Sequence, residues 1–202
     1  MGARWLIGVD EAGRGPLAGP AAVGAVMVTR DFDWNLVKGA KDSKQMTALA
    51  RERMFEHMRS LKGEGTLRFV VTFSSAAAIG RSGIVPAIHS AVARGLIKLD
   101  ARPSECEIRL DGSLSAPEEF ENQTTIIRGD ELETIISLAS IVAKVQRDRL
   151  MIRLAKEHPE YGFDIHMGYG TLKHRTAIKK NGFCKLHRAT FCRNLLSGLN
   201  TV

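Results

Sequence analysis

The sequence predicts an α/β fold, with a mixed β-sheet flanked by helices and a small helical subdomain at the C-terminal end. Two observations lead to this prediction. Short apolar runs of strand length alternate with longer segments of helical periodicity, and after Pro159 the composition shifts to glycine, histidine and basic residues. A chain of 202 residues can bury a sizeable core as one domain. We therefore expect a single domain over 1–202, of which about 157–202 is a basic helical appendage.

The first half of the chain is expected to supply three strands and two helices. Segments 5–9 and 21–29 are apolar enough to be central strands, and we expect them to pair antiparallel across a glycine–proline loop. The segment 47–61 begins with a threonine that can cap a helix. Segment 67–73 is a third strand candidate, and 84–99 has the spacing of a helix with one buried face.

Two short strands are expected next, and each leads into an aspartate. Segment 107–110 runs into Asp111, and 124–127 runs toward Asp130. The same pattern occurs at Asp10, after the first strand. Such an aspartate taken alone is typical of a solvated turn.

The remaining elements are expected to be helical. Segment 133–156 is apolar through its first half and strongly charged in its second, which predicts one long helix. A short helix is expected from Thr171 to an Asn181-Gly182 stop, with another near the carboxyl end.

Composition restricts the classes of partner. The formal net charge of +7 favours a polyanion, because basic side chains that neutralise phosphates release condensed counterions. Nucleic acid, an anionic membrane surface and an ordinary basic protein without such a partner all remain open on charge alone. The three cysteines are odd in number and lack zinc-site spacing, so we expect reduced thiols. With neither a signal peptide nor a membrane span indicated, the expected location is cytoplasmic.

The most informative segment is 7–20, Ile-Gly-Val-Asp-Glu-Ala-Gly-Arg-Gly-Pro-Leu-Ala-Gly-Pro. In a regular strand Asp10 and Glu11 point to opposite faces, so presenting both to one ligand requires the chain to turn there. Gly13 and Gly15 permit such a turn and let their N–H groups approach a substrate closely. Arg14 lies between them. Adjacent carboxylates followed by a glycine-rich loop suit a metal-dependent site that acts on phosphate.

Four acids fit the needs of hard divalent cations such as Mg²⁺, which prefer oxygen ligands and retain some water. They are Asp10, Glu11, Asp111 and Asp130, all expected at strand ends or in the loops that follow. Crowded carboxylates raise one another's pKa, so the metal-free cluster is expected to be strained. Two ions roughly 3.5–4 Å apart can activate a water and stabilise the leaving oxygen of a phosphodiester, which makes a hydrolytic nuclease.

The run from Asp10 to Pro20 resembles the opening signature of the type 2 ribonuclease H family, to which bacterial ribonuclease HII belongs. Further blocks resemble the family in the same order along the chain. These are Lys41-Asp42-Ser43-Lys44, Leu110-Asp111-Gly112, Arg128-Gly129-Asp130, the run 136–149 and Gly168-Tyr169-Gly170-Thr171. Each block alone is weak, whereas the ordered set is very specific. The Gly-Arg-Gly loop and the lack of an extra N-terminal domain favour type HII over type HIII.

The resemblance implies a ribonuclease H-like fold and a catalytic site in which two Mg²⁺ or Mn²⁺ ions are held by the four acids. It implies that RNA/DNA hybrids, and duplex DNA that contains a single ribonucleotide, are cut on the 5′ side of the ribonucleotide to leave a 5′-phosphate and a 3′-hydroxyl. It also implies that Gly13, Arg14 and Gly15 read the ribose 2′-hydroxyl. Tyr169 would pack on the neighbouring sugar, which suits an exposed aromatic face. We expect a monomer.

The sequence leaves the roles of several further residues open. Met167 replaces a lysine that commonly precedes Gly-Tyr-Gly in the family, so a phosphate contact is either missing or supplied by His166, Lys173 or His174. All six histidines are expected to contact phosphate or lie on the surface, and Asp148 is expected to pair with an arginine on its helix. Further basic residues are candidates for backbone contacts, although such residues are usually only solvated: Lys41, Lys44, Lys144, Lys173 and Arg175.

Two other function classes remain open at this stage. A non-catalytic nucleic-acid-binding protein would explain the charge but has no need for acids that weaken phosphate binding. Another two-metal DNA nuclease of ribonuclease H-like fold would share the acids but not the ribose-reading loop.

Overall fold

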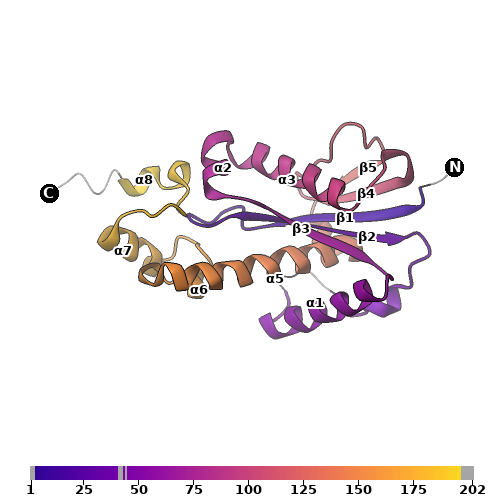
Figure 1. Cartoon of the computed structure of the whole chain (residues 1–202), viewed down its shortest axis with the longest axis horizontal. Helices are drawn as coiled ribbons and strands as arrows, with labels where there is room; N and C mark the ends of the chain where they lie inside the picture. The colour runs from indigo at the N-terminus through magenta and orange to yellow at the C-terminus, as the bar shows by residue number, and fades with distance from the viewer. Residues whose placement is uncertain (1–2, 41–42, 44, 197–202) are drawn as a thin grey trace.

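A computed structural model describes residues 3–40, 43 and 45–196, and its centre is a five-stranded mixed sheet (Figure 1). The strand order is β3-β2-β1-β4-β5. The pairs β1–β2 and β2–β3 are antiparallel, whereas β1–β4 and β4–β5 are parallel. The strands are β1 Trp5–Ala12, β2 Ala21–Thr29, β3 Arg68–Ser74, β4 Cys106–Asp111 and β5 Gln123–Ile126. The predicted antiparallel pairing of the first two strands is confirmed.

Strand β1 continues past its two acids. Asp10 pairs with Gly24, Glu11 with Val23 and Ala12 with Ala22, so the chain is still extended where a turn was expected. The prediction of a turn at Asp10 and Glu11 is therefore wrong, because the antiparallel ladder with β2 carries β1 two residues further. The parallel pairing of β1, β4 and β5 brings the carboxyl ends of these three strands to the same edge of the sheet.

Helices cover both faces of the sheet (Figure 1). Helix α3 packs on one face, where its apolar residues join Ile7, Val9 and Ile108 in one core. Helices α5 and α1 form a second core on the other face. Glycine allows α5 to lie close to the sheet, since a Cβ on Gly8 or Gly24 would fall about 2 Å from a carbonyl oxygen of this helix. The helices are α1 Ala48–Gly63, α2 Ala76–Ser82, α3 Ile84–Lys98, α4 Gly129–Leu132, α5 Thr134–Glu157, α6 Phe163–His166, α7 Leu172–Asn181 and α8 Arg193–Leu196, with short 3₁₀ turns at Trp34–Val37, Pro103–Glu105, Pro159–Tyr161 and Ala189–Phe191.

Two helices, α1 and α7, begin at the threonines from which the sequence predicted them to start. The hydroxyl of Thr47 accepts a hydrogen bond from the Ala50 N–H at the start of α1, and Thr171 does the same for α7. Helices α2, α4 and α6 were not expected. Helix α4 is a single turn that follows Arg128, whose φ is 57°, so Asp130 stands in a helical turn and not directly at the end of a strand.

The C-terminal segment packs as a small layer against the end of α5 (Figure 1). Its apolar cluster includes Met151, Tyr161, Phe163 and Ile178. It also contacts the loop after β1, because the N–H groups of Leu17 and Ala18 donate to the Gly168 carbonyl at 2.9 and 3.3 Å. Among the described residues, none of the helices combines the length and the apolar character that crossing a bilayer requires.

Candidate metal centre and substrate cleft

Three aspartates converge at the carboxyl edge of β1 and β4. Asp10, Asp111 and Asp130 each offer a carboxylate oxygen, and these three oxygens all lie within 4.8 Å of one another. Asp10 comes from β1, Asp111 ends β4 and Asp130 stands in α4. The parallel pairing of β1 with β4 and of β4 with β5 is what unites side chains that lie about a hundred residues apart. We call this group the acidic cluster.

Backbone contacts hold the acidic cluster in place. The Asp130 N–H donates to Asp111 Oδ1 at 3.2 Å, and the Glu11 N–H donates to Asp10 Oδ1 at 2.7 Å. The Ser137 hydroxyl donates to the Asp130 carbonyl at 2.7 Å, which fixes α4 against the first turn of α5. The carboxylates therefore stand on a rigid frame of two strands and a helix, and a frame of this kind can hold ligands in a set geometry.

The electrostatics of the acidic cluster disfavour its fully ionised form. Burial raises the pKa of Asp10 well above its ordinary value, and the nearby carboxylates of Glu11 and Asp111 raise it further. Asp10 is only 3% exposed. A hydrogen bond with the Ser140 side chain partly offsets this effect on the Asp10 pKa. A cation bound among the three carboxylates would remove the repulsion, and oxygen donors are those that Mg²⁺ and Mn²⁺ prefer.

Glu11 lies beside the acidic cluster and is not one of the three converging acids. Its neighbour is Arg14, whose guanidinium approaches Glu11 Oε1 at 3.3 Å. Burial raises the pKa of Glu11, while Arg14 opposes the rise. The alternation of side chains along β1 accounts for the separation, because Asp10 and Glu11 leave the strand on opposite sides.

A cleft of about 290 Å³ joins the acids to the glycine-rich loop. Its walls include Gly13, Arg14, Gly15 and Tyr169, all four of the residues that the sequence indicated for substrate binding. Asp10, Glu11 and Asp111 also line it. Tyr169 is 46% exposed, so its ring is accessible from solvent.

Two further wall residues, Ser43 and Ser140, were missed by the sequence analysis. Their hydroxyl oxygens lie 2.8 Å apart. Ser140 interrupts the buried apolar stripe of α5, and this polar residue in an apolar stripe is the signal that could have identified it. Lys41 and Lys44, which flank Ser43 in sequence, lie outside the described residues.

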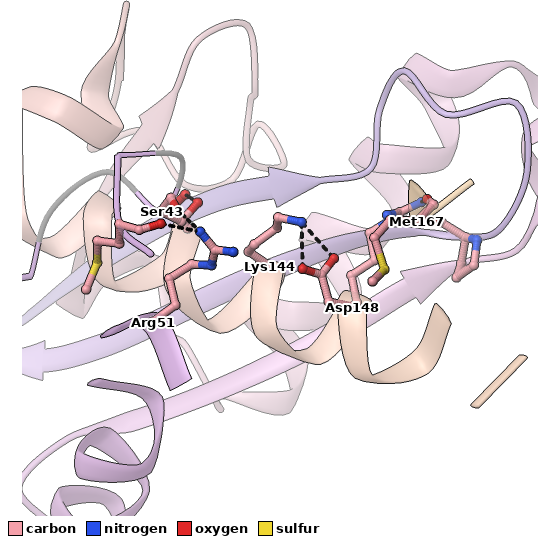
Figure 2. A network of polar contacts seen from close by, with 9 residues as sticks. Ser43, Arg51, Lys144, Asp148 and Met167 are labelled. Carbon is pink, nitrogen blue, oxygen red and sulfur yellow. Dashed lines mark hydrogen bonds and ion pairs between the residues drawn. The ribbon is translucent and has the colours of Figure 1, made fainter. Parts of the chain in front are cut away.

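Lys144 also lines the cleft, one helical turn from Asp148 (Figure 2). The Lys144 ammonium is 2.7 and 2.6 Å from the two carboxylate oxygens of Asp148. Asp148 was expected to pair with an arginine. Its partner is instead the lysine four residues earlier, because that side chain lies on the same face of α5.

Three of the histidines contradict the expectation of surface or phosphate contact. His166, His174 and His187 are at most 8% exposed. His174 Nε2 lies 3.1 Å from His187 Nε2, and His166 Nε2 lies 2.8 Å from the Tyr161 carbonyl oxygen. Neither His166 nor His174 can therefore replace the phosphate contact that Met167 lacks. Their aromatic neighbours Tyr161 and Phe163 explain why these histidines are buried.

Comparison with known proteins identifies relatives over nearly the whole chain. The family model for ribonuclease HII matches residues 7–194. The ribonuclease HII of Polynucleobacter asymbioticus is 42% identical over 199 residues, which cover 96% of this chain and 97% of that protein. That of Endomicrobium trichonymphae is 40% identical over 186 residues, covering 92% and 84% of the two chains.

Solved structures agree with the fold. The ribonuclease H2 of Pyrococcus horikoshii has a TM-score of 0.73 at 25% identity and is covered fully, with 98% of this chain aligned. A structure described as Bst-RNase HIII in complex with Mn²⁺ has a TM-score of 0.71 at 20% identity, with 98% of this chain and 71% of that chain covered. The second likeness concerns the fold alone.

Proposed function

This chain belongs to the ribonuclease HII family, and we propose that its reaction takes place at the acidic cluster. As a family member the chain is a metal-dependent endoribonuclease that acts on RNA/DNA hybrids and on ribonucleotides embedded in DNA. One observation carries the assignment of the site. Two of the three converging aspartates, Asp10 and Asp111, line one cleft with the Gly-Arg-Gly loop and Tyr169, so the metal-binding groups and the ribose-reading groups face one volume.

We assign the divalent metal site to Asp10, Asp111 and Asp130, and propose that it takes two Mg²⁺ or Mn²⁺ ions. Glu11 leaves β1 on the opposite side but lines the same cleft at the end of the strand, so we propose it as a fourth ligand. The all-oxygen donor set supports these metals, and the Mn²⁺ complex of the structurally similar ribonuclease HIII is consistent with such a site in this fold. The raised pKa of Asp10 supports the same assignment, because a buried carboxylate next to other carboxylates gains most from a nearby cation.

The residues of this chain have distinct tasks in the proposed mechanism. Bound divalent ions supply the Lewis acidity that activates water and stabilises charge on the phosphate. Asp10, Asp111 and Asp130 would hold these ions at a fixed place on the edge of the sheet. Lys144 and Arg14 add positive charge at the cleft wall, where a phosphodiester would lie. Hydrolysis would break the bond to the 3′-oxygen on the 5′ side of the ribonucleotide, and would leave a 3′-hydroxyl and a 5′-phosphate.

Substrate choice would depend on the 2′-hydroxyl, which is the group that separates ribose from deoxyribose. We propose that backbone groups of Gly13, Arg14 and Gly15 read this hydroxyl. The half-exposed ring of Tyr169 is placed to pack on the next sugar, since it lines the same cleft.

The wider assignments follow the sequence-based expectations. We propose a single domain, with about 157–202 as an appendage that contributes Tyr169 to the cleft, and a monomeric enzyme in the cytoplasm. The three unpaired cysteines fit a reducing location.

The test uses three duplexes of one sequence: all DNA, DNA with one ribonucleotide, and a continuous RNA/DNA hybrid. With Mg²⁺ we expect the last two to be cut and the all-DNA duplex to stay intact, with no cutting in EDTA. The single-ribonucleotide product should end in a 3′-hydroxyl that a DNA polymerase can extend. Comparable cutting of the all-DNA duplex would favour a different two-metal nuclease, and binding without cutting would favour a non-catalytic protein.

A further inference from the structure

Two arginines are buried beneath the substrate loops. Arg188 is 0% exposed and Arg147 is 1% exposed. Among the described residues neither forms an ion pair, and every hydrogen bond from their guanidinium groups goes to a backbone carbonyl. A buried cation without a carboxylate partner is costly, so such a group needs many well-placed acceptors to remain charged.

Arg188 makes the larger set of these contacts. Its Nη2 donates to the Gly13 carbonyl at 2.7 Å, its Nη1 to the Arg14 carbonyl at 2.9 Å and its Nε to the Gly19 carbonyl at 2.9 Å. The fork of the guanidinium therefore holds both ends of the loop that follows β1. Two of the three acceptors belong to the Gly-Arg-Gly segment itself.

These contacts determine where two N–H groups point. In a planar trans peptide the N–H is directed away from the C=O of the same unit. The unit whose carbonyl is on Gly13 carries the N–H of Arg14, and the unit whose carbonyl is on Arg14 carries the N–H of Gly15. With both carbonyls turned inward to Arg188, both N–H groups turn outward. In the described part of the chain, neither N–H donates to a protein acceptor.

On the outward side, these two N–H groups face the cleft. Arg14 and Gly15 both line it, and Gly15 is exposed. A positively charged guanidinium that donates to a carbonyl also polarises the peptide unit of that carbonyl. The N–H of the same unit therefore becomes a better hydrogen-bond donor. Burial and the neighbouring Arg147 lower the pKa of Arg188 to about 10, so the group stays protonated at neutral pH.

Arg147 joins this loop to the Tyr169 segment. Its Nε donates to the Pro20 carbonyl at 2.9 Å, and its Nη2 donates to the Met167 carbonyl at 3.0 Å. It also lies directly against Gly13, where a Cβ would fall 1.8 Å from Arg147 Nε and where φ is +83°. Gly13 is therefore required by the arginine behind it as well as by its backbone angle.

We propose that Arg188 is a positioning residue for ribose recognition, which aims the N–H groups of Arg14 and Gly15 at the 2′-hydroxyl from beneath the loop. The inference rests on the proposed function of the Gly-Arg-Gly loop and adds the residue that sets the loop's donors. Arg188 touches neither substrate nor metal in this role. Arg147 supports the same loop and ties it to the tyrosine that lies on the neighbouring sugar.

The test measures the dissociation constants of two duplexes, one with a single ribonucleotide and one all DNA. Binding is followed by fluorescence anisotropy with Mg²⁺ in an Asp10→Asn background, where the substrate is not cut. The readout is the ratio of the two constants, because this ratio does not depend on the fraction of folded protein. Arg188→Gln should lower the preference for the ribonucleotide by about 5- to 30-fold, corresponding to the loss of two oriented hydrogen bonds. Arg188→Lys should lower this preference less, since the single ammonium group of lysine replaces the three donating nitrogens of the guanidinium and keeps the positive charge.

Arg51→Gln is the matched control. Arg51 also donates to two backbone carbonyls, that of the cleft residue Ser43 at 2.5 Å (Figure 2) and that of Met46 at 2.7 Å. Its loop is not the Gly-Arg-Gly loop. This variant should weaken both duplexes alike and leave the ratio unchanged. An equal fall of the ratio in Arg51→Gln would mean general loosening of the cleft and would overturn the inference.

The remaining outcomes separate the two proposals. If the two dissociation constants are nearly equal in the Asp10→Asn protein with Arg188 intact, the loop does not read the ribose. That result would refute the proposed function. A clear preference that survives in Arg188→Gln would leave the proposed function intact and overturn the role of Arg188. Should Arg188→Gln fail to fold, the folded Arg188→Lys variant decides the question, and an unchanged ratio there overturns the role.

Discussion

The acidic cluster and the histidine pair of the C-terminal segment, His174 and His187, are both buried polar groups, yet they are stabilised in opposite ways. In the acidic cluster, burial and like charges both raise the pKa of Asp10. The carboxylates stay close because the sheet and α4 hold them there. In the histidine pair the side chains are neutral, since burial lowers the pKa of both.

Hydrogen bonds run through the histidine pair without a break. His174 Nδ1 lies 2.9 Å from the Tyr169 carbonyl oxygen, and its Nε2 lies 3.1 Å from His187 Nε2. The Cys184 N–H donates to His187 Nδ1 at 3.0 Å. One tautomer of each neutral ring satisfies all of these contacts, with His174 protonated on Nδ1 and His187 on Nε2. The difference teaches that burial alone does not mark a functional site. A cluster whose charges repel calls for a ligand, whereas a cluster that satisfies itself supports the fold.

The largest expected effect comes from neutralising the acidic cluster. Asp10→Asn should lower the cleavage rate of a single-ribonucleotide duplex by at least about 10³-fold, because metal-based stabilisation of the transition state amounts to several kcal/mol. The metal-free variant should unfold at the same temperature as the native chain or higher, since repulsion and the cost of burying charge both fall.

Glu107→Gln is the control for this change. Glu107 is also buried, but it lies near the start of β4 and pairs with Arg30 and Arg109. We expect the Glu107→Gln variant to be less stable than the native chain but to cleave at the same rate per folded molecule. Full activity in Asp10→Asn would contradict the assignment of the metal ligands.

The histidine pair should make stability depend on pH with the opposite sign to the acids. The pKa of His187 is about 4 in the folded chain against an ordinary value of 6.5. Between these values the unfolded chain binds more protons, so the free energy of unfolding falls as pH falls from 6.5 toward 4, by up to about 3 kcal/mol from this residue. Urea unfolding at pH 7 and pH 5 measures the change. The difference should shrink in His187→Gln, and an identical pH dependence in that variant would refute the assignment.

Metal binding should sharpen the contrast between the two clusters. Mg²⁺ at 100 times its dissociation constant should raise the free energy of unfolding by about 2.7 kcal/mol. The rise should be lost in Asp10→Asn and retained in His187→Gln, as followed by thermal unfolding with and without EDTA. Equal stabilisation of Asp10→Asn and the native chain would place the metal elsewhere.

The smallest expected effect is on substrate recognition by Tyr169. Tyr169→Ala should cost roughly 1–3 kcal/mol on a single-ribonucleotide duplex, through loss of stacking, and less on a continuous hybrid. Metal-dependent stabilisation should be unchanged. Leu172→Ala, which removes a side chain that is 83% exposed nearby, should affect both substrates little. Equal proportional losses of the cleavage rate on both substrates in Tyr169→Ala would argue against junction sensing.

Much of the fold could be predicted from the sequence because its signals are local. The apolar runs that predicted β1 and β2 depend only on neighbouring residues, and so do the capping threonines of α1 and α7. Helices α2, α4 and α6 were missed because short helices have too few residues for a clear period. The candidate acids were identifiable because each stands in a recognisable motif, and these motifs follow one another in the order that the family shows.

The sequence by itself indicated which residues are candidates for the chemistry, and the tertiary structure decided which of them meet. Three acids converge while Glu11 turns to Arg14, because the register of β1 fixes which side of the strand each one leaves. The histidines were expected on the surface or at phosphate, and the sequence analysis did not single out Arg188, since a polar side chain carries no local sign of burial. Their partners are up to 175 residues away, at Gly13 in the case of Arg188. The fate of a charged or polar group depends on such distant partners, and only packing brings them together.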